Sequence, residues 1–293
     1  MNALKRTWRD EKWYILFLVP GLCLFILALV IPLGMGVKYS FTNWDGVSRT
    51  LHYIGWDNYA HALQDSDFWG ALGNTFKYAI ILTLLVNLIA LLLALVLDSF
   101  LKFRNLFRTI FFLPTVISVV LAGFIWSYNY SKGFPNLFKL MGIDGIMSPL
   151  GNPDYALWGV IIVAVWQGIG TPMIIYIAGL QSIPKELLES AGMDGAGIGY
   201  KFWHVTLPLL APSVTINMVL GLTGALKVFD LIYVTTKGGP GFSTEVLTTF
   251  IYRVSFNSLK AGYGTALSMM FFVLLVLVTL IQIMIFRRRE VEI

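Results

Sequence analysis

Six long apolar segments constrain the fold of this 293-residue chain more than any other feature. They occupy residues 13–37, 74–97, 109–128, 157–180, 209–233 and 264–286. Each is long enough to cross a bilayer, because an α-helix needs about 20 residues to span ~30 Å of hydrocarbon. Only 13% of the residues are charged, against about 25% in soluble domains. We therefore expect an all-α, polytopic membrane protein with six transmembrane helices.

The distribution of lysine and arginine predicts how these segments are oriented. Twelve of these residues lie in 1–12, 98–108, 181–208 and the tail after 286, and seven lie in 38–73, 129–155 and 234–263. An excess of positive charge marks cytoplasmic loops, so both termini and residues 181–208 are predicted to be cytoplasmic. Residues 1–12 then form a basic cytoplasmic leader. The net charge of +5 fits loops that face anionic lipid, not nucleic acid.

The sequence lacks the residue patterns that metal binding and phosphate binding would need. Cys23 is the only cysteine, and His52, His61 and His204 lie far apart, so no metal-ligand spacing is present. The glycine-rich residues 195–202 do not form a phosphate-binding loop, because Tyr200 and Phe202 flank the lysine. We therefore expect a protein that is not an enzyme and that binds neither a metal nor a cofactor itself.

The hydrophilic stretch between the fourth and fifth segments, residues 181–208, has an ordered pattern. Pro184 suits the first turn of a helix, where its missing N–H is not needed. Residues 185–191 are then predicted to form a short helix. Four glycines follow within the next eight residues and permit an irregular backbone. Such a stretch is too long for a simple turn.

Within this stretch, Glu189-Ser190-Ala191 is followed by Asp194-Gly195-Ala196 and then by Leu207-Pro208. This order resembles the cytoplasmic EAA loop of the membrane subunits of bacterial ABC importers, with Ser190 in place of the middle alanine. A plain amphipathic loop helix is the alternative. The resemblance implies a coupling helix that docks in a cleft of an ATP-binding subunit. It implies a coupling role for Glu189, Ala191, Asp194, Gly195, Ala196, Leu207 and Pro208.

Other parts of the chain resemble the sugar-type permeases of the same class. They are residues 39–44 with 54–59, residues 106–114 and residues 229–240. The last two are similar to the larger maltose permease subunit and to the A-type subunits of glycerol-phosphate and lactose permeases. The resemblance implies a type I ABC importer permease fold over residues 13–293, as a single domain in the bacterial cytoplasmic membrane. The implied partners are a second permease subunit in a heterodimer, two ATPase subunits that use ATP and Mg, and an extracytoplasmic solute-binding protein.

The resemblance also places the substrate path, in the fourth and fifth apolar segments. The implied residues are Trp166, Gln167, Gly168, Thr171, Thr223 and Gly224. Helix–helix packing through small and polar residues is the alternative role for them. Lys227 and Asp230 are the charged residues of the fifth segment, and at i, i+3 spacing they are expected to share one helix face, where they can pair. Such charges could be functional or could form a structural pair within the helix. Residues 244–262 are expected to return along the external surface.

The resulting expectation is a permease subunit of an ATP-driven, binding-protein-dependent importer for a sugar or a sugar-like solute. The residues leave two alternatives open. One is an ion- or proton-coupled secondary transporter that acts alone, and the other is an ABC permease for an amino acid or a polyol. Charged residues inside the spans are scarce, and Lys77 is the only one in the second, third, fourth and sixth segments. This scarcity disfavours a proton relay.

Overall fold

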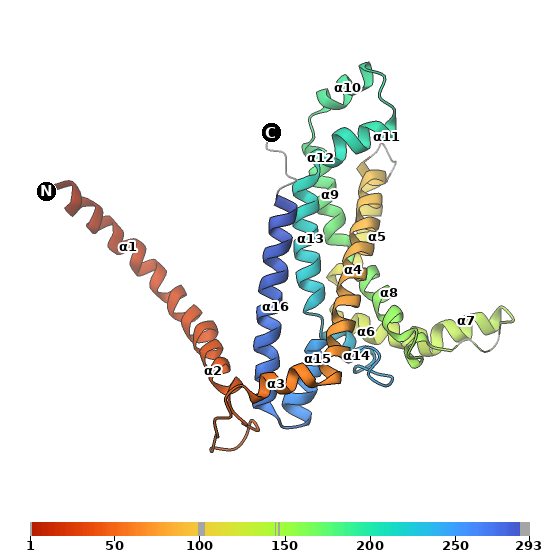
Figure 1. Cartoon of the computed structure of the whole chain (residues 1–293). Helices are drawn as coiled ribbons and strands as arrows, with labels where there is room; N and C mark the ends of the chain where they lie inside the picture. Colours follow the sequence, from red (N-terminus) through yellow and green to blue (C-terminus); the bar gives the residue numbers. More distant parts are fainter. Residues whose placement is uncertain (1, 99–102, 144, 146, 288–293) are drawn as a thin grey trace. The chain divides into compact units, whose positions relative to one another are not determined.

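The computed structural model describes residues 2–98, 103–143, 145 and 147–287, and this part of the chain is helical apart from its loops and one isolated β-bridge (Figure 1). Three helices in it are long and apolar enough to cross a membrane, and three further pairs of bent helices raise the number of candidate spans to six. The chain divides into two units. The first contains the described residues up to Gln64 together with Ile251–Phe271, and the second contains Asp65–Phe250 and the described residues after Phe271.

In the first unit, the first predicted span is one continuous helical stretch. It consists of α1 (Asn2–Phe25), a π-helical turn (Ile26–Val30) and α2 (Ile31–Ser40). The helix passes the expected boundary at residue 12 without interruption. Almost all side chains between residues 14 and 37 are exposed within this chain.

A polar loop follows, and hydrogen bonds hold it to α3 (Asp57–Gln64). The amide of the buried Asn58 donates to the carbonyls of Ser40 and Thr42, at 2.8 and 2.9 Å. Thr42 also forms the β-bridge with Tyr53. A single asparagine therefore fixes both ends of the turn that leaves α2.

The second unit begins with α4, and its elements follow in chain order. They are α4 (Ser66–Asp98), α5 (Arg104–Val116), α6 (Val119–Tyr128), a π-helical turn (Asn129–Gly133), α7 (Phe134–Leu140), a 3₁₀ turn (Pro149–Gly151), α8 (Ala156–Gly168) and α9 (Gly170–Ser182). After these come α10 (Lys185–Met193), α11 (Ile198–Lys201), a π-helical turn (Phe202–Thr206), α12 (Leu207–Leu209), α13 (Ala211–Leu226) and α14 (Asp230–Thr235). In Figure 1, α10 and α11 lie at one end of this unit and α14 lies at the opposite end.

The remaining elements divide between the two units. They are α15 (Leu247–Tyr252), a π-helical turn (Arg253–Asn257) and α16 (Ala261–Arg287). Residues 244–250 were expected on the surface, but six of these seven are buried.

Lys102, Arg288 and Arg289, which contribute to the predicted orientation, lie outside the described residues.

Three of the predicted spans are interrupted, which the apolar pattern does not show. The third turns by 96° between α5 and α6, two residues after Pro114, so the proline lies inside α5 and not at the break. The fourth bends by 45° at Ile169. The fifth was expected to run to residue 233, but α13 ends at Leu226. A hydropathy profile shows only which residues are apolar. The profile is therefore the same for a straight helix and for a broken one.

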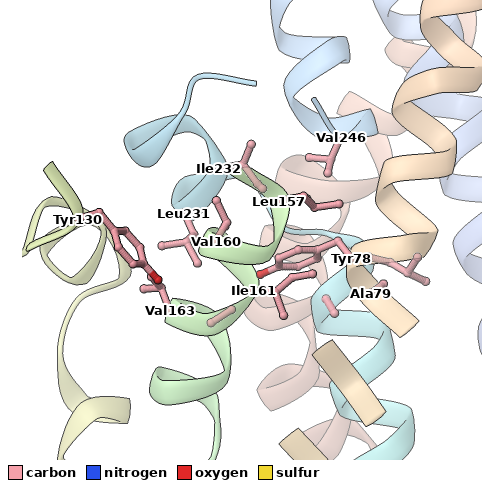
Figure 2. Packing of buried hydrophobic residues seen from close by; sticks show 13 residues of the cluster. Tyr78, Ala79, Tyr130, Leu157, Val160, Ile161, Val163, Leu231, Ile232 and Val246 are labelled. Atoms are coloured by element: carbon pink, nitrogen blue, oxygen red, sulfur yellow. The ribbon is translucent and has the colours of Figure 1, made fainter. Parts of the chain in front are cut away.

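The core of the second unit joins α4, α8 and α14. Tyr78, Val160 and Ile232 are almost fully buried there and lie around the same point (Figure 2). Small residues allow other helices to approach closely, as is usual in membrane bundles. A Cβ atom on Gly179 of α9 would lie 2.2 Å from the Oγ atom of Ser213 on α13, so no larger residue fits between these two helices.

Candidate functional site

A cavity of about 510 Å³ lies within the second unit. Its wall is formed by α4, by the α5–α6 break, by the α8–α9 bend and by the residues between α13 and α14. The polar side chains on this wall are Tyr78, Thr83, Asn87, Thr115, Gln167, Lys227 and Asp230. The α5–α6 break, the α8–α9 bend and the break between α13 and α14 therefore border the same cavity. Irregular backbone at membrane depth is tolerated where it lines a protected cavity, and such positions carry the binding sites of many transporters.

Three of the six predicted substrate-path residues line this cavity, namely Gln167, Gly168 and Gly224. The other three do not. The ring of Trp166 packs edge-to-face against Trp126, with 5.5 Å between centroids. Thr171 is exposed away from the cavity wall, and the buried hydroxyl of Thr223 has no hydrogen-bond partner among the described residues.

The predicted pairing of Lys227 and Asp230 on one helix face is wrong. Lys227 is the C-cap of α13, and Asp230 is the first residue of α14, so a break separates them. No ion pair joins them in the part of the chain that the structure describes. Both side chains are exposed, and both residues line the cavity. One positive and one negative group are therefore available to a bound solute.

Two polar residues of α4, Thr83 and Asn87, also line the cavity and were not expected there. The hydroxyl of Tyr176 donates to Oδ1 of Asn87 at 2.7 Å, and the Asn87 amide donates to the carbonyl of Thr83 at 2.8 Å. Asn87 is buried on the cavity wall. An asparagine in the middle of an apolar segment is costly unless it is bonded, and this signal could have identified it.

Helix α10 carries Glu189 on its exposed surface. The helix begins at Lys185, as expected, and continues to Met193, two residues beyond the expected end at residue 191. The Glu189 side chain is exposed, and the structure gives it no bond within the described residues. Met193 and Ile198 are about nine-tenths exposed, at 90% and 91%. A carboxylate beside exposed apolar side chains can dock against another protein surface.

The residues after Glu189 end the helix. The N–H of Ala196 donates to the carbonyl of Ala191 at 2.9 Å, and the N–H of Gly195 donates to that of Gly192 at 3.0 Å. Asp194 is the C-cap, and Gly195 has a φ of +81°. These two bonds and the left-handed glycine form a Schellman motif. The structure thus gives four of the predicted coupling residues a shared position at this helix end.

Leu207 and Pro208 lie at the base of the same stretch, in α12, and both are half-buried. The next core residue, Leu210, is fully buried in a cluster with Met173 and Tyr176 of α9. The stretch therefore exposes much of α10 and is anchored where it rejoins the bundle.

Comparison with known proteins gives one family match, which covers residues 86–291. The family is described as the binding-protein-dependent transport system inner membrane component. Two curated relatives match nearly the whole chain. A probable starch degradation products transport system permease protein, AmyD of Thermoanaerobacterium thermosulfurigenes, is 34% identical and covers 100% of both chains. A multiple sugar-binding transport system permease protein, MsmF of Streptococcus mutans, is 33% identical and covers 96% of this chain and 98% of its own.

A solved structure matches the fold as a whole. The crystal structure of a bacterial ABC transporter involved in the import of the acidic polysaccharide alginate contains a chain with a TM-score of 0.83 to this one. The two chains are 25% identical, and the match covers 97% of this chain and 99% of that one. The helical arrangement described above is therefore that of an ABC importer membrane subunit.

Proposed function

We propose a function from the premise that this chain belongs to the family of binding-protein-dependent transport system inner membrane components. It is a multi-pass permease subunit of a binding-protein-dependent ABC importer. Such a subunit is not an enzyme and binds no cofactor, since the ATPase subunits of the complex use the ATP.

The imported solute is a sugar or an oligosaccharide. The cavity carries this proposal, because its wall combines amides, hydroxyls and two charges of opposite sign with apolar surface. Hydroxyl-rich solutes are bound by such donors and acceptors. The names of AmyD and MsmF, which refer to starch degradation products and to multiple sugars, support the same class. Gln167, Gly168 and Gly224 are the predicted path residues best placed to contact the solute. Trp166, Thr171 and Thr223 support the path from outside the cavity wall.

Helix α10 couples this subunit to an ATPase subunit. Its exposed Glu189 and the capped turn formed by Ala191, Asp194, Gly195 and Ala196 present a rigid surface for docking. Leu207 and Pro208 connect that surface to α13. When two ATPase subunits close on ATP, α10 transmits the motion and the spans move between inward-open and outward-open states. This step requires ATP to favour one of the two states, because equal affinity for both would shift nothing.

This chain supplies half of the translocation path, and a second permease subunit supplies the other half. The α10 end of the second unit faces the cytoplasm, together with both termini. The excess of lysine and arginine in the segments on that side supports this orientation. The solute-binding protein docks on the opposite side.

The test is purification of a tagged chain from its native membrane, followed by mass spectrometry of the proteins that accompany it. We expect an ATPase, a second and different permease, and a binding protein captured in the presence of ATP. The complex is then reconstituted in liposomes and supplied with radiolabelled sugars and amino acids. ATP-dependent uptake of a sugar supports the proposal. A homodimer, or uptake of an amino acid alone, contradicts it.

A further inference from the structure

Two interrupted spans of the second unit meet at Gln167, at the end of α8. The last four carbonyls of a helix have no partner within that helix. Ile117 is the C-cap of α5 and Gln167 is the second-last residue of α8, so both carbonyls belong to this group. At membrane depth, such carbonyls need another donor, since unsatisfied backbone groups are costly in hydrocarbon.

Each of the two interruptions supplies a hydrogen-bond donor to the unpaired carbonyl of the other. The side-chain amide of Gln167 donates to the carbonyl of Ile117 at 2.7 Å. The hydroxyl of Thr115 donates to the carbonyl of Gln167 at 2.9 Å. Gln167 is 9% exposed, so little water can compete for these groups. The α5–α6 break and the α8–α9 bend are therefore joined by a reciprocal pair of hydrogen bonds.

The backbones at this junction are close together. A Cβ atom on Gly170, the first residue of α9, would lie 2.5 Å from Oγ1 of Thr115 and 2.9 Å from Cα of Phe112. Helix α5 therefore packs directly on the start of α9, with no room for another side chain. The hydrogen bonds and this packing act at the same place.

We propose that Gln167 is a positioning residue that makes the two interrupted spans move together. Thr115, Ile117 and Gln167 all line the cavity, so this junction is also part of the wall around a solute. Movement of α8 and α9 is passed through the junction to the α5–α6 break, and the cavity wall changes as one piece. The proposal rests on the proposed function as an importer, but it gives Gln167 a role that does not depend on contact with the solute.

The first test measures hydrogen exchange in the purified, assembled complex, without solute. Replacing Gln167 with leucine removes the amide donor at nearly the same volume. Loss of one such bond changes a local opening equilibrium by about fivefold. We expect exchange of the amides in residues 117–122 to become about fivefold faster in Q167L. T115V, which removes the other donor, is expected to act in the same direction and serves if Q167L does not assemble.

Gln282 provides a matched control. It is 7% exposed, and its amide donates to the carbonyl of Met218 at 3.2 Å. Met218 lies inside α13, where helical bonding already satisfies its carbonyl. Q282L is therefore expected to leave exchange in residues 117–122 unchanged. Equal exchange in Q167L and the wild type would overturn the proposal.

The second test measures ATP hydrolysis by the same complexes in liposomes, without solute or binding protein. If Gln167 makes the two spans move together, its loss allows the ATPase subunits to hydrolyse ATP without moving the cavity wall. We therefore expect ATP hydrolysis to rise about threefold or more in Q167L but not in Q282L. Faster exchange with unchanged hydrolysis would show a structural bond only, and would also overturn the proposal. Solute-loaded binding protein is then added to the wild-type complex as a separate check of the proposed function. If it does not stimulate hydrolysis, the proposed function is contradicted, while the exchange result stands.

Discussion

The hydroxyl of Thr248, on α15, donates a hydrogen bond to the backbone carbonyl of Val228, in the break between α13 and α14. The segment that holds Thr248 is tied to α4 as well, because the N–H of Leu247 donates to the hydroxyl of Thr75 at 2.8 Å. Val228 lines the cavity beside Lys227 and Asp230. A segment far along the chain thus stabilises the interruption that brings these two charges to the cavity.

We expect Thr248→Val to destabilise this break, because valine has the same shape as threonine and lacks the donor. The loss of a hydrogen bond to a partly buried carbonyl costs about 1 kcal/mol. The apparent melting temperature of the detergent-solubilised complex should therefore fall. Thr248→Ser keeps the hydroxyl and should retain most of the stability. If serine and valine lower the melting temperature equally, packing of the methyl group matters more than the bond.

Much of the architecture could be predicted from the sequence, because bilayer thickness requires apolar segments of a certain length. The six candidate spans and the position of α10 followed from hydropathy, proline and glycine alone. The breaks at Ile117–Ser118 and at Lys227–Phe229 did not follow. They depend on donors supplied by Gln167 and Thr248, residues that are distant in sequence. The expected pairing of Lys227 with Asp230 failed for this reason, since it assumed an unbroken helix.

The cavity was predictable only in part. Gln167, Gly168 and Gly224 were expected on the substrate path, which stays a prediction, and the structure places them on the cavity wall. Thr83 and Asn87 were not expected, although the asparagine in an apolar span was a usable signal, because hydropathy does not reveal which side of the helix faces the cavity. The bond from Tyr176 to Asn87 connects α9 with α4, and tertiary structure alone brings them together.

The loop after α2 should be sensitive to acid. One carboxylate oxygen of Asp45 accepts hydrogen bonds from the N–H groups of Ser48 and Val47, at 2.8 and 2.9 Å. These bonds lower the pKa of Asp45 below its ordinary value. The folded pKa is depressed, so the stabilisation is complete above the unfolded pKa of about 3.9 and is lost as the pH falls through the folded value. The protection of the amides of residues 45–50 against hydrogen exchange, measured relative to the intrinsic rate at the same pH, should therefore fall in acid below about pH 4. In Asp45→Ala the same amides should be weakly protected at every pH, and a pH-dependent step in the protection of that variant would assign the effect to another group.

We expect Glu189→Lys to abolish coupling, because it reverses the charge of the exposed carboxylate on α10. The side chain makes no bond within the described residues, so the subunit itself should fold and insert normally. Uptake by the reconstituted complex should fall at least tenfold, about 1.4 kcal/mol, which lies within the range for loss of a single interface contact. Glu186→Lys, in the first turn of the same helix, is the matched control for a change of net charge. Equal loss in both variants would indicate a general charge effect, and unchanged uptake in Glu189→Lys would contradict the coupling role.

The end of α10 offers a test of shape without any change of charge. Gly195 has a φ of +81°, and Gly197, two residues later, has a φ of −70°. A Cβ atom would meet no other atom within 4 Å at either glycine, so only the backbone angle distinguishes them. Alanine in the left-handed region costs about 1–2 kcal/mol. Gly195→Ala should therefore loosen the end of the helix and reduce uptake about fivefold or more, whereas Gly197→Ala should have little effect. Gly195→Asn should restore part of the activity, because asparagine tolerates this conformation better than alanine. If asparagine is as inactive as alanine, the position requires the absence of a side chain, for example against a docked ATPase, and not the left-handed turn.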